Sequence, residues 1–211
     1  MADTYPFLET VLAKDGRLPR LPWHQARLER TCAANGIRRS FDLASLIDPP
    51  ERGTFRCRFL YGDAGWLVEF HPYVFRPPRA LKIIRDDTID YRFKSTDRRR
   101  LNALFERRGE ADDVLIVRRG LVTDTTVANT AFRIDGVWLT PQTPLLEGTA
   151  RARLIAEGKL IPAAVTETAA RNAEKVAVMN ALSGFVELEA GILSDENGAD
   201  SDAACTEREP C

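Results

Sequence analysis

Histidine, lysine and long apolar runs are all scarce in this sequence of 211 residues. The two histidines, His24 and His71, stand far apart without metal-ligand spacing, and no two cysteines form a Cys-x-x-Cys pair. No apolar run approaches the roughly 18 residues that span a bilayer. The opening MADTYPFLET also lacks the charged and apolar regions of a secretion signal. These absences argue against a metal site, a disulfide framework and a membrane protein, and they predict a cytoplasmic address.

Charge is balanced along the chain. The net charge is −1, which gives no general attraction to nucleic acid or to a membrane surface. The basic run Arg98–Arg100 adjoins Leu101, Leu104 and Phe105 at helical spacing, so we expect a solvated helix face rather than a nucleic-acid site. Neither a Gly-x-Ser-x-Gly elbow nor a phosphate-loop glycine pattern is present. The common hydrolase and nucleotide-binding functions therefore lack support.

The first third of the chain predicts a small α/β domain over residues 1–76. Apolar runs at 7–13 and 17–21 flank an Asp-Gly turn and predict a hairpin. A helix is expected to begin after Pro22 and to stop near Asn35. A second hairpin is expected around the Gly-Asp-Ala-Gly turn further on.

Two consecutive prolines in RPPRA disfavour both helix and central strand, so residues 77–80 are predicted to link two domains. A larger, strand-rich domain is expected over 81–193. From 194 to 211 the sequence is acidic and nearly free of bulky apolar residues, which predicts a disordered tail. The larger domain should contain strands near 80–85, 113–118, 130–134, 137–140, 160–167, 175–180 and 184–190, and helices near 96–107 and 148–157.

Three segments between residues 91 and 155 together look like a pyridoxal phosphate site. YRFKSTDRRRLN contains Lys94, GLVTDTTVANTAF contains Asp124 and Asn129, and TPLLEGTARARLI contains Gly148 and Thr149. This cofactor needs an amine to hold its aldehyde as a Schiff base, a carboxylate to keep its ring nitrogen protonated, and amide donors around its phosphate. The three segments could supply one of each.

Arginine outnumbers lysine by 25 to 5, and this limits the search for the amine. A guanidinium is not an amine nucleophile toward an aldehyde, so only a lysine could form the Schiff base. Lys94 lies between apolar YRF and polar STDRRR, which suits the exit of a strand into a loop. The other candidates are Lys14, Lys82, Lys159 and Lys175.

The order and flanking residues of these segments resemble the class IV aminotransferase family over about residues 5–190. FLETVLAKDGRLPRLPWHQARLERT is similar to the family's Phe-x-x-Thr strand, Asp-Gly turn and His-x-x-Arg-Leu helix. The family includes branched-chain aminotransferases, D-amino-acid transaminases and 4-amino-4-deoxychorismate lyases. The resemblance implies an α/β (α+β) fold of type IV, with a small α/β domain and a strand-rich pseudo-barrel domain. It also implies a homodimer, because a second subunit helps to wall the site in this family.

The resemblance assigns roles to individual residues. Lys94 would form the Schiff base, and Asp124 would pair with the ring nitrogen where the family usually has glutamate. Arg27 matches the arginine that binds the phosphate. The remaining cofactor-binding residues that it implies are Asn129, Gly148, Thr149, Asn180 and Ala181.

Three functions are consistent with these motifs. AEKVAVMNALSGFVEL resembles the lyase subgroup's Asn-Ala/Ser-Leu segment, which favours a lyase that forms 4-aminobenzoate and pyruvate. A branched-chain or D-amino-acid aminotransferase would use the same catalytic residues on another amino substrate. A catalytically inactive relative that serves as a binding protein is the third possibility, since the family's opening Asn-Gly segment is missing and Asp124 replaces the usual glutamate.

Overall fold

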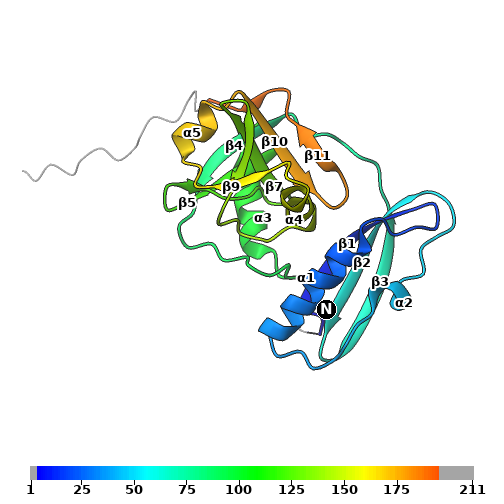
Figure 1. Ribbon diagram of the computed structural model, residues 1–211. Coiled ribbons are helices and arrows are strands. Elements are labelled where there is room, and N and C mark those ends of the chain that lie inside the picture. The colour runs from blue at the N-terminus through cyan, green and yellow to red at the C-terminus, as the bar shows by residue number, and fades with distance from the viewer. Residues whose placement is uncertain (1–3, 195–211) are drawn as a thin grey trace, which may run out of the picture.

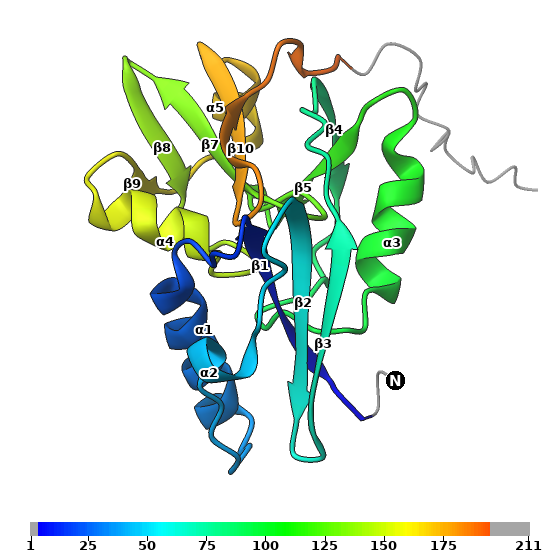
Figure 2. The same cartoon turned by 90° about the vertical axis from the view of Figure 1, so that its right-hand side faces the viewer.

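The computed structural model describes residues 4–194, in which the strands form two separate groups (Figure 1). The first group is an antiparallel sheet of order β1-β2-β3, made of β1 (Phe7–Lys14), β2 (Thr54–Gly62) and β3 (Gly65–Pro72). Helix α1 (Leu21–Ala34) lies along one face of this sheet (Figure 2). One face is therefore covered by a helix, and the other is turned away from it.

Side-chain alternation explains this packing. Val11 and Ala13 on β1 share one face with Cys57 and Phe59 on β2, and all four are buried in one cluster with Leu28 of α1. Residues between them point to the opposite face of the sheet, because successive side chains on a strand alternate. This second face borders the pocket described below.

The predicted hairpin between 7–13 and 17–21 is wrong. Strand β1 pairs along its whole length with β2 instead, and only an isolated bridge joins its end to the residues that follow. The sequence after the turn contains Pro19 and Pro22, which have no N–H to donate to a strand ladder. Pro22 instead lies in the first turn of α1, where a missing N–H costs nothing.

Two sheets form the second group, one of order β11-β10-β7-β8-β9 and one of order β12-β4-β5-β6. The strands are β4 (Ala80–Arg85), β5 (Asp113–Arg118), β6 (Leu121–Val122), β7 (Asn129–Ile134), β8 (Val137–Pro141), β9 (Ile161–Ala163), β10 (Lys175–Asn180), β11 (Gly184–Glu187) and β12 (Gly191–Ile192). The helices are the short α2 (Leu43–Leu46) of the first group, then α3 (Arg99–Phe105) with the 3-10 turn η1 (Glu106–Arg108), α4 (Thr149–Ala156) and α5 (Glu167–Arg171).

The two larger sheets pack face to face, and a helix covers each outer side. Leu115 and Val117 on β5 enter the cluster between the sheets, whereas Val114 and Ile116 enter the cluster with α3. Strand β10 alternates in the same way between the central cluster and α4. This packing explains why these strands read as continuous apolar runs in the sequence, since both of their faces are buried.

The mixed α/β architecture is confirmed, and most predicted strands and helices of the second group are present. The strand expected at 160–167 is wrong in extent, because β9 ends at Ala163 and α5 begins at Glu167. The Thr166 hydroxyl accepts a hydrogen bond from the Ala169 N–H and so caps that helix.

The chain between β3 and β4 forms neither a helix nor a strand. The domain limits given by the sequence remain a prediction. From residue 195 on, the predicted tail lies outside the described residues. Between residues 4 and 194, no helix is both long and apolar enough to cross a membrane.

Candidate functional site

A pocket of about 380 Å³ lies between the first group of elements and the two larger sheets. Its walls take residues from β1, β2 and α1 on one side, and from the loops and strands after β4 on the other. All of the residues to which the family resemblance assigned a role line this pocket. They are Arg27, Lys94, Asp124, Asn129, Gly148, Thr149, Asn180 and Ala181.

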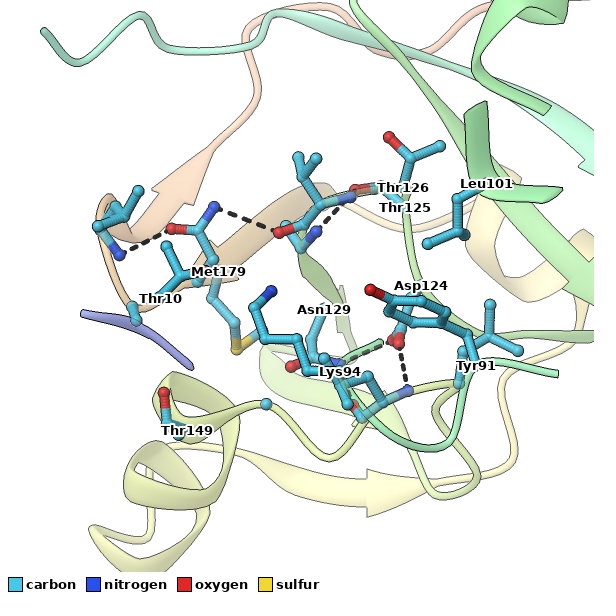
Figure 3. Close-up of a pocket in the computed structure, with 18 of the residues that line it drawn as sticks. Thr10, Tyr91, Lys94, Leu101, Asp124, Thr125, Thr126, Asn129, Thr149 and Met179 are labelled. Atoms are coloured by element: carbon cyan, nitrogen blue, oxygen red, sulfur yellow. Dashed lines mark hydrogen bonds between the residues drawn. The ribbon is translucent and has the colours of Figure 1, made fainter. Parts of the chain in front are cut away.

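Main-chain hydrogen bonds fix the position of Lys94. Its carbonyl accepts a hydrogen bond of 3.0 Å from the Leu8 N–H, and the Thr96 N–H donates to Pro6 over 2.9 Å, so β1 fixes the loop that bears the lysine. Its amine extends into the pocket (Figure 3) and has no hydrogen-bond partner among residues 4–194. Burial, with the positive charge of Arg27, lowers the pKa of this ammonium to about 7. A neutral, nucleophilic amine is therefore available near neutral pH.

Asp124 provides the buried carboxylate of the pocket. One of its oxygens accepts a hydrogen bond from the Asn129 side-chain amide, and the other accepts one from the Leu146 N–H, each over 2.9 Å (Figure 3). Burial raises the pKa of this carboxyl to about 7, although both hydrogen bonds lower it. A cationic partner in the pocket would favour the ionised form, since an opposite charge offsets the cost of burial.

Gly148 is explained by its contact with Asn129. A Cβ at this position would lie 1.8 Å from Asn129 Oδ1, so only glycine leaves room for that side chain. Asn129 also donates to the Leu146 carbonyl over 2.8 Å, which fixes its amide between Asp124 and this turn. Gly148 therefore leaves room for the Asn129 amide that donates a hydrogen bond to Asp124.

Replacing Gly148 with alanine should displace Asn129 and remove its hydrogen bond to Asp124. We expect a loss of about 1–3 kcal/mol in the free energy of unfolding, the usual cost of overpacking, measured by urea denaturation. In an Asn129→Ala background the clash is gone, so the same glycine substitution should cost much less. An equal cost in both backgrounds would show that Asn129 is not the reason for the glycine.

Arg27 reaches the pocket while it is anchored from behind by Glu9. Its Nε donates to Glu9 Oε1 over 2.8 Å, and its Nη2 donates to Glu9 Oε2 over 2.5 Å. His24 Nδ1 lies 2.7 Å from the same Oε2. Burial alone would raise the pKa of Glu9, but the charge of Arg27 and the hydrogen bonds from Arg27 and His24 lower it to about 2. The third guanidinium nitrogen, Nη1, has no partner in the described part of the chain and is available to an anion.

Thr149 opens helix α4, which packs against α1. Thr149 is a buried residue, and its hydroxyl makes no hydrogen bond within residues 4–194. The first N–H groups of a helix have no partner within it, and the helix dipole favours negative charge at this end. With Arg27 on the neighbouring helix, the start of α4 is suited to a phosphate.

Asn180 has a local structural task at the end of β10. Its Oδ1 accepts hydrogen bonds of 2.9 Å from the N–H groups of Leu182 and Ser183, which shapes the turn that presents Ala181 to the pocket. Only its Nδ2, at 3.5 Å from the Val127 carbonyl, faces another segment. The side-chain oxygen is thus already occupied by the turn.

Arginines missed by the sequence analysis also line the pocket. Arg98, expected on a solvated helix face, donates to the Thr126 carbonyl over 2.9 Å and packs over the Tyr91 ring, so that expectation is wrong for this residue. It precedes α3 rather than lying on its outer face. Arg56 and Arg58 alternate with buried residues along β2 and so point to the pocket face of the sheet. That alternation was visible in TFRCRF and could have revealed them.

Comparisons with known proteins give consistent matches. The sequence model of the family described as Amino-transferase class IV matches residues 76–190. An uncharacterized protein of Haemophilus influenzae is 32% identical over 187 residues, which is 86% of this chain and 100% of that protein.

Two solved structures are informative. A candidate 4-amino-4-deoxychorismate lyase from Haemophilus somnus 129pt is 33% identical, with a TM-score of 0.80 over 85% of this chain and 97% of that one. A hypothetical aminotransferase of Mycobacterium tuberculosis, in its form with α-ketoglutarate and PMP, gives a TM-score of 0.72 at 16% identity over 90% of this chain and 83% of that one. The second likeness shows a shared fold.

Proposed function

Because the chain belongs to the class IV aminotransferases, a family of pyridoxal phosphate-dependent enzymes, we propose that it acts as a 4-amino-4-deoxychorismate lyase. Such an enzyme forms 4-aminobenzoate and pyruvate from an amino substrate that carries two carboxylates. The relative with 33% identity bears that name as a candidate lyase, which supports the proposal.

The pocket's cationic wall is the observation that carries this choice. Arg56, Arg58 and Arg98 surround the pocket in addition to Arg27. Of these, Arg58 is paired with Glu69 over 2.6 Å, whereas Arg56 and Arg98 form no ion pair within the described chain. Guanidinium groups suit carboxylates, and an apolar branched side chain would gain nothing from them. The arrangement favours a substrate with two carboxylates over a branched-chain amino acid.

The residues of the pocket fit the cofactor. Lys94 offers an amine without a hydrogen-bond partner, and Asp124 offers a carboxylate held by two donors. Arg27 Nη1, the Thr149 hydroxyl and the first N–H groups of α4 form an anion site at a helix start. The aldehyde, the ring nitrogen and the phosphate of pyridoxal phosphate thus each have a complementary residue.

Bound pyridoxal phosphate would supply an electron-accepting ring next to the carbon that bears the substrate amine. Lys94 would remove the proton from that carbon, because its lowered pKa leaves a large fraction of it neutral at pH 7. Asp124 would keep a proton on the ring nitrogen. The arginine wall would orient the substrate carboxylates. Removal of that proton by Lys94 would break the ether bond at the adjacent ring carbon, so that the ring becomes aromatic and the enolate of pyruvate leaves and takes up a proton.

The test begins with purified protein and added pyridoxal phosphate. We expect a new absorbance band, and borohydride reduction should fix the label on the peptide that contains Lys94. The rate of attachment should increase with pH through about 7, since Lys94 is protonated below its lowered pKa and neutral above it. Pyruvate release from 4-amino-4-deoxychorismate would support the lyase.

Other outcomes separate the alternatives. Amino transfer to a keto acid without pyruvate release would favour an aminotransferase, and the absence of both band and label would favour an inactive binding protein. The proposal includes a homodimer, to be checked by analytical ultracentrifugation.

A further inference from the structure

Glu9 is a fully buried, ionised carboxylate whose polar partners are Arg27 and His24. It lies on the face of β1 that also carries Val11, it is opposite Phe59 in the ladder, and its exposed fraction is 0%. It is not part of the pocket wall. Burying a charge in such surroundings is costly, so its presence calls for a task that an apolar residue could not perform.

The hydrogen bonds indicate what that task is. Both oxygens of Glu9 bind the Nε and Nη2 edge of Arg27, and this two-point contact fixes the plane of the guanidinium. His24, one turn before Arg27 on α1, contacts Oε2 of the same carboxylate. Nη1 is then the part of Arg27 that remains for a ligand in the pocket.

We infer that Glu9 is a positioning residue that directs Arg27 Nη1 toward the cofactor phosphate. Its negative charge offsets part of the positive charge of Arg27, but its hydrogen bonds give the guanidinium a fixed orientation. The inference rests on the proposed function, since it takes the phosphate to lie at Arg27 and α4. Without Glu9, the guanidinium would carry more uncompensated positive charge but could turn away from the phosphate. If the orientation of Arg27 determines phosphate affinity, loss of this carboxylate should weaken binding. If the net charge of Arg27 determines it, the same loss should strengthen binding.

The experiment compares Glu9→Gln with the wild-type chain for two ligands, pyridoxal phosphate and pyridoxal, which has no phosphate. Affinities are read from absorbance titrations, without any assay of activity. We expect Glu9→Gln to weaken pyridoxal phosphate binding about tenfold or more, the usual scale for a lost charge-assisted contact. Pyridoxal binding should change much less. The control is Glu29→Gln, an exposed glutamate of α1 that accepts a hydrogen bond from Gln25, and it should leave both affinities unchanged.

Equal losses for both ligands would overturn the inference, because a general structural defect does not distinguish them. Tighter binding of pyridoxal phosphate would also overturn it and would make Glu9 a simple charge neutraliser. If Glu9→Gln does not fold, Glu9→Asp keeps the charge but moves it back by one methylene, and an unchanged preference for the phosphorylated ligand in that variant would refute the positioning role. Failure of the wild-type chain to bind either aldehyde would instead contradict the proposed function.

Discussion

Replacing Lys94 with alanine is expected to abolish covalent cofactor attachment and to reduce turnover by at least about 10²–10⁴-fold, the range for one acid–base group. The loss should exceed that of any other single lysine, because Lys94 would serve both as the amine that holds the aldehyde and as the base that moves the proton. Borohydride labelling and pyruvate release measure the two roles separately. Lys14→Ala is the matched control, since Lys14 is exposed at the end of β1.

The fold should survive this substitution. The Lys94 side chain makes no hydrogen bond in the part of the chain that the structure describes, and its burial as a cation is unfavourable. Far-UV circular dichroism and the urea midpoint should therefore match or exceed those of the wild-type chain. A label that persists in Lys94→Ala would disprove the assignment of the reactive amine.

Asp124→Asn is expected to lower turnover by about 10²–10⁴-fold while the label on Lys94 remains. The amide has almost the shape of the carboxylate but carries no charge, so it would not keep the ring nitrogen protonated. Asp124→Glu is the informative partner, because it keeps the charge and restores the residue that the family usually has here. It should retain far more activity than the asparagine variant.

The pH dependence of Asp124 has a definite sign. Its pKa of about 7 lies above the ordinary value of an aspartate, so the folded chain without ligand binds a proton that the unfolded chain has already lost. Its contribution to stability is present in full below about pH 4 and is lost as the pH rises through about 7. A bound cation should reverse this trend.

The two Asp124 variants test the role of the charge in turnover. If Asp124→Asn and Asp124→Glu were equally active, the charge would have no role.

The sequence predicted which residues share the pocket better than it predicted the connections around it. Lys94, Asp124 and Gly148 belong to short motifs at strand exits and helix starts, where local residue types carry the information. The partner of β1 could not be obtained in this way, because β1 and β2 are separated by two helices and by many residues. The segment FLET contains Glu9, but the sequence could not show that Glu9 contacts Arg27, because this contact depends on how α1 packs on the sheet.

The positions of the pocket arginines also could not be predicted fully from the sequence. A basic run beside an amphipathic helix is usually solvated, and sequence alone could not show that Arg98 precedes the helix and turns back to Thr126. Arg56 and Arg58 had a local signal in strand alternation. Which face of that strand would border a pocket was decided only by the placement of the second group of sheets.

The pairing of Pro6 and Leu8 with the loop around Lys94 has a consequence for the order of folding. These contacts join residues more than 80 positions apart, so their formation requires the closure of a long chain segment. During synthesis these contacts around Lys94 could not form before residues 94–96 had emerged. A ligand that binds only the completed pocket would then stabilise the joined state over either half alone. Supply of the cofactor would thus control how long a newly made chain remains open to proteolysis.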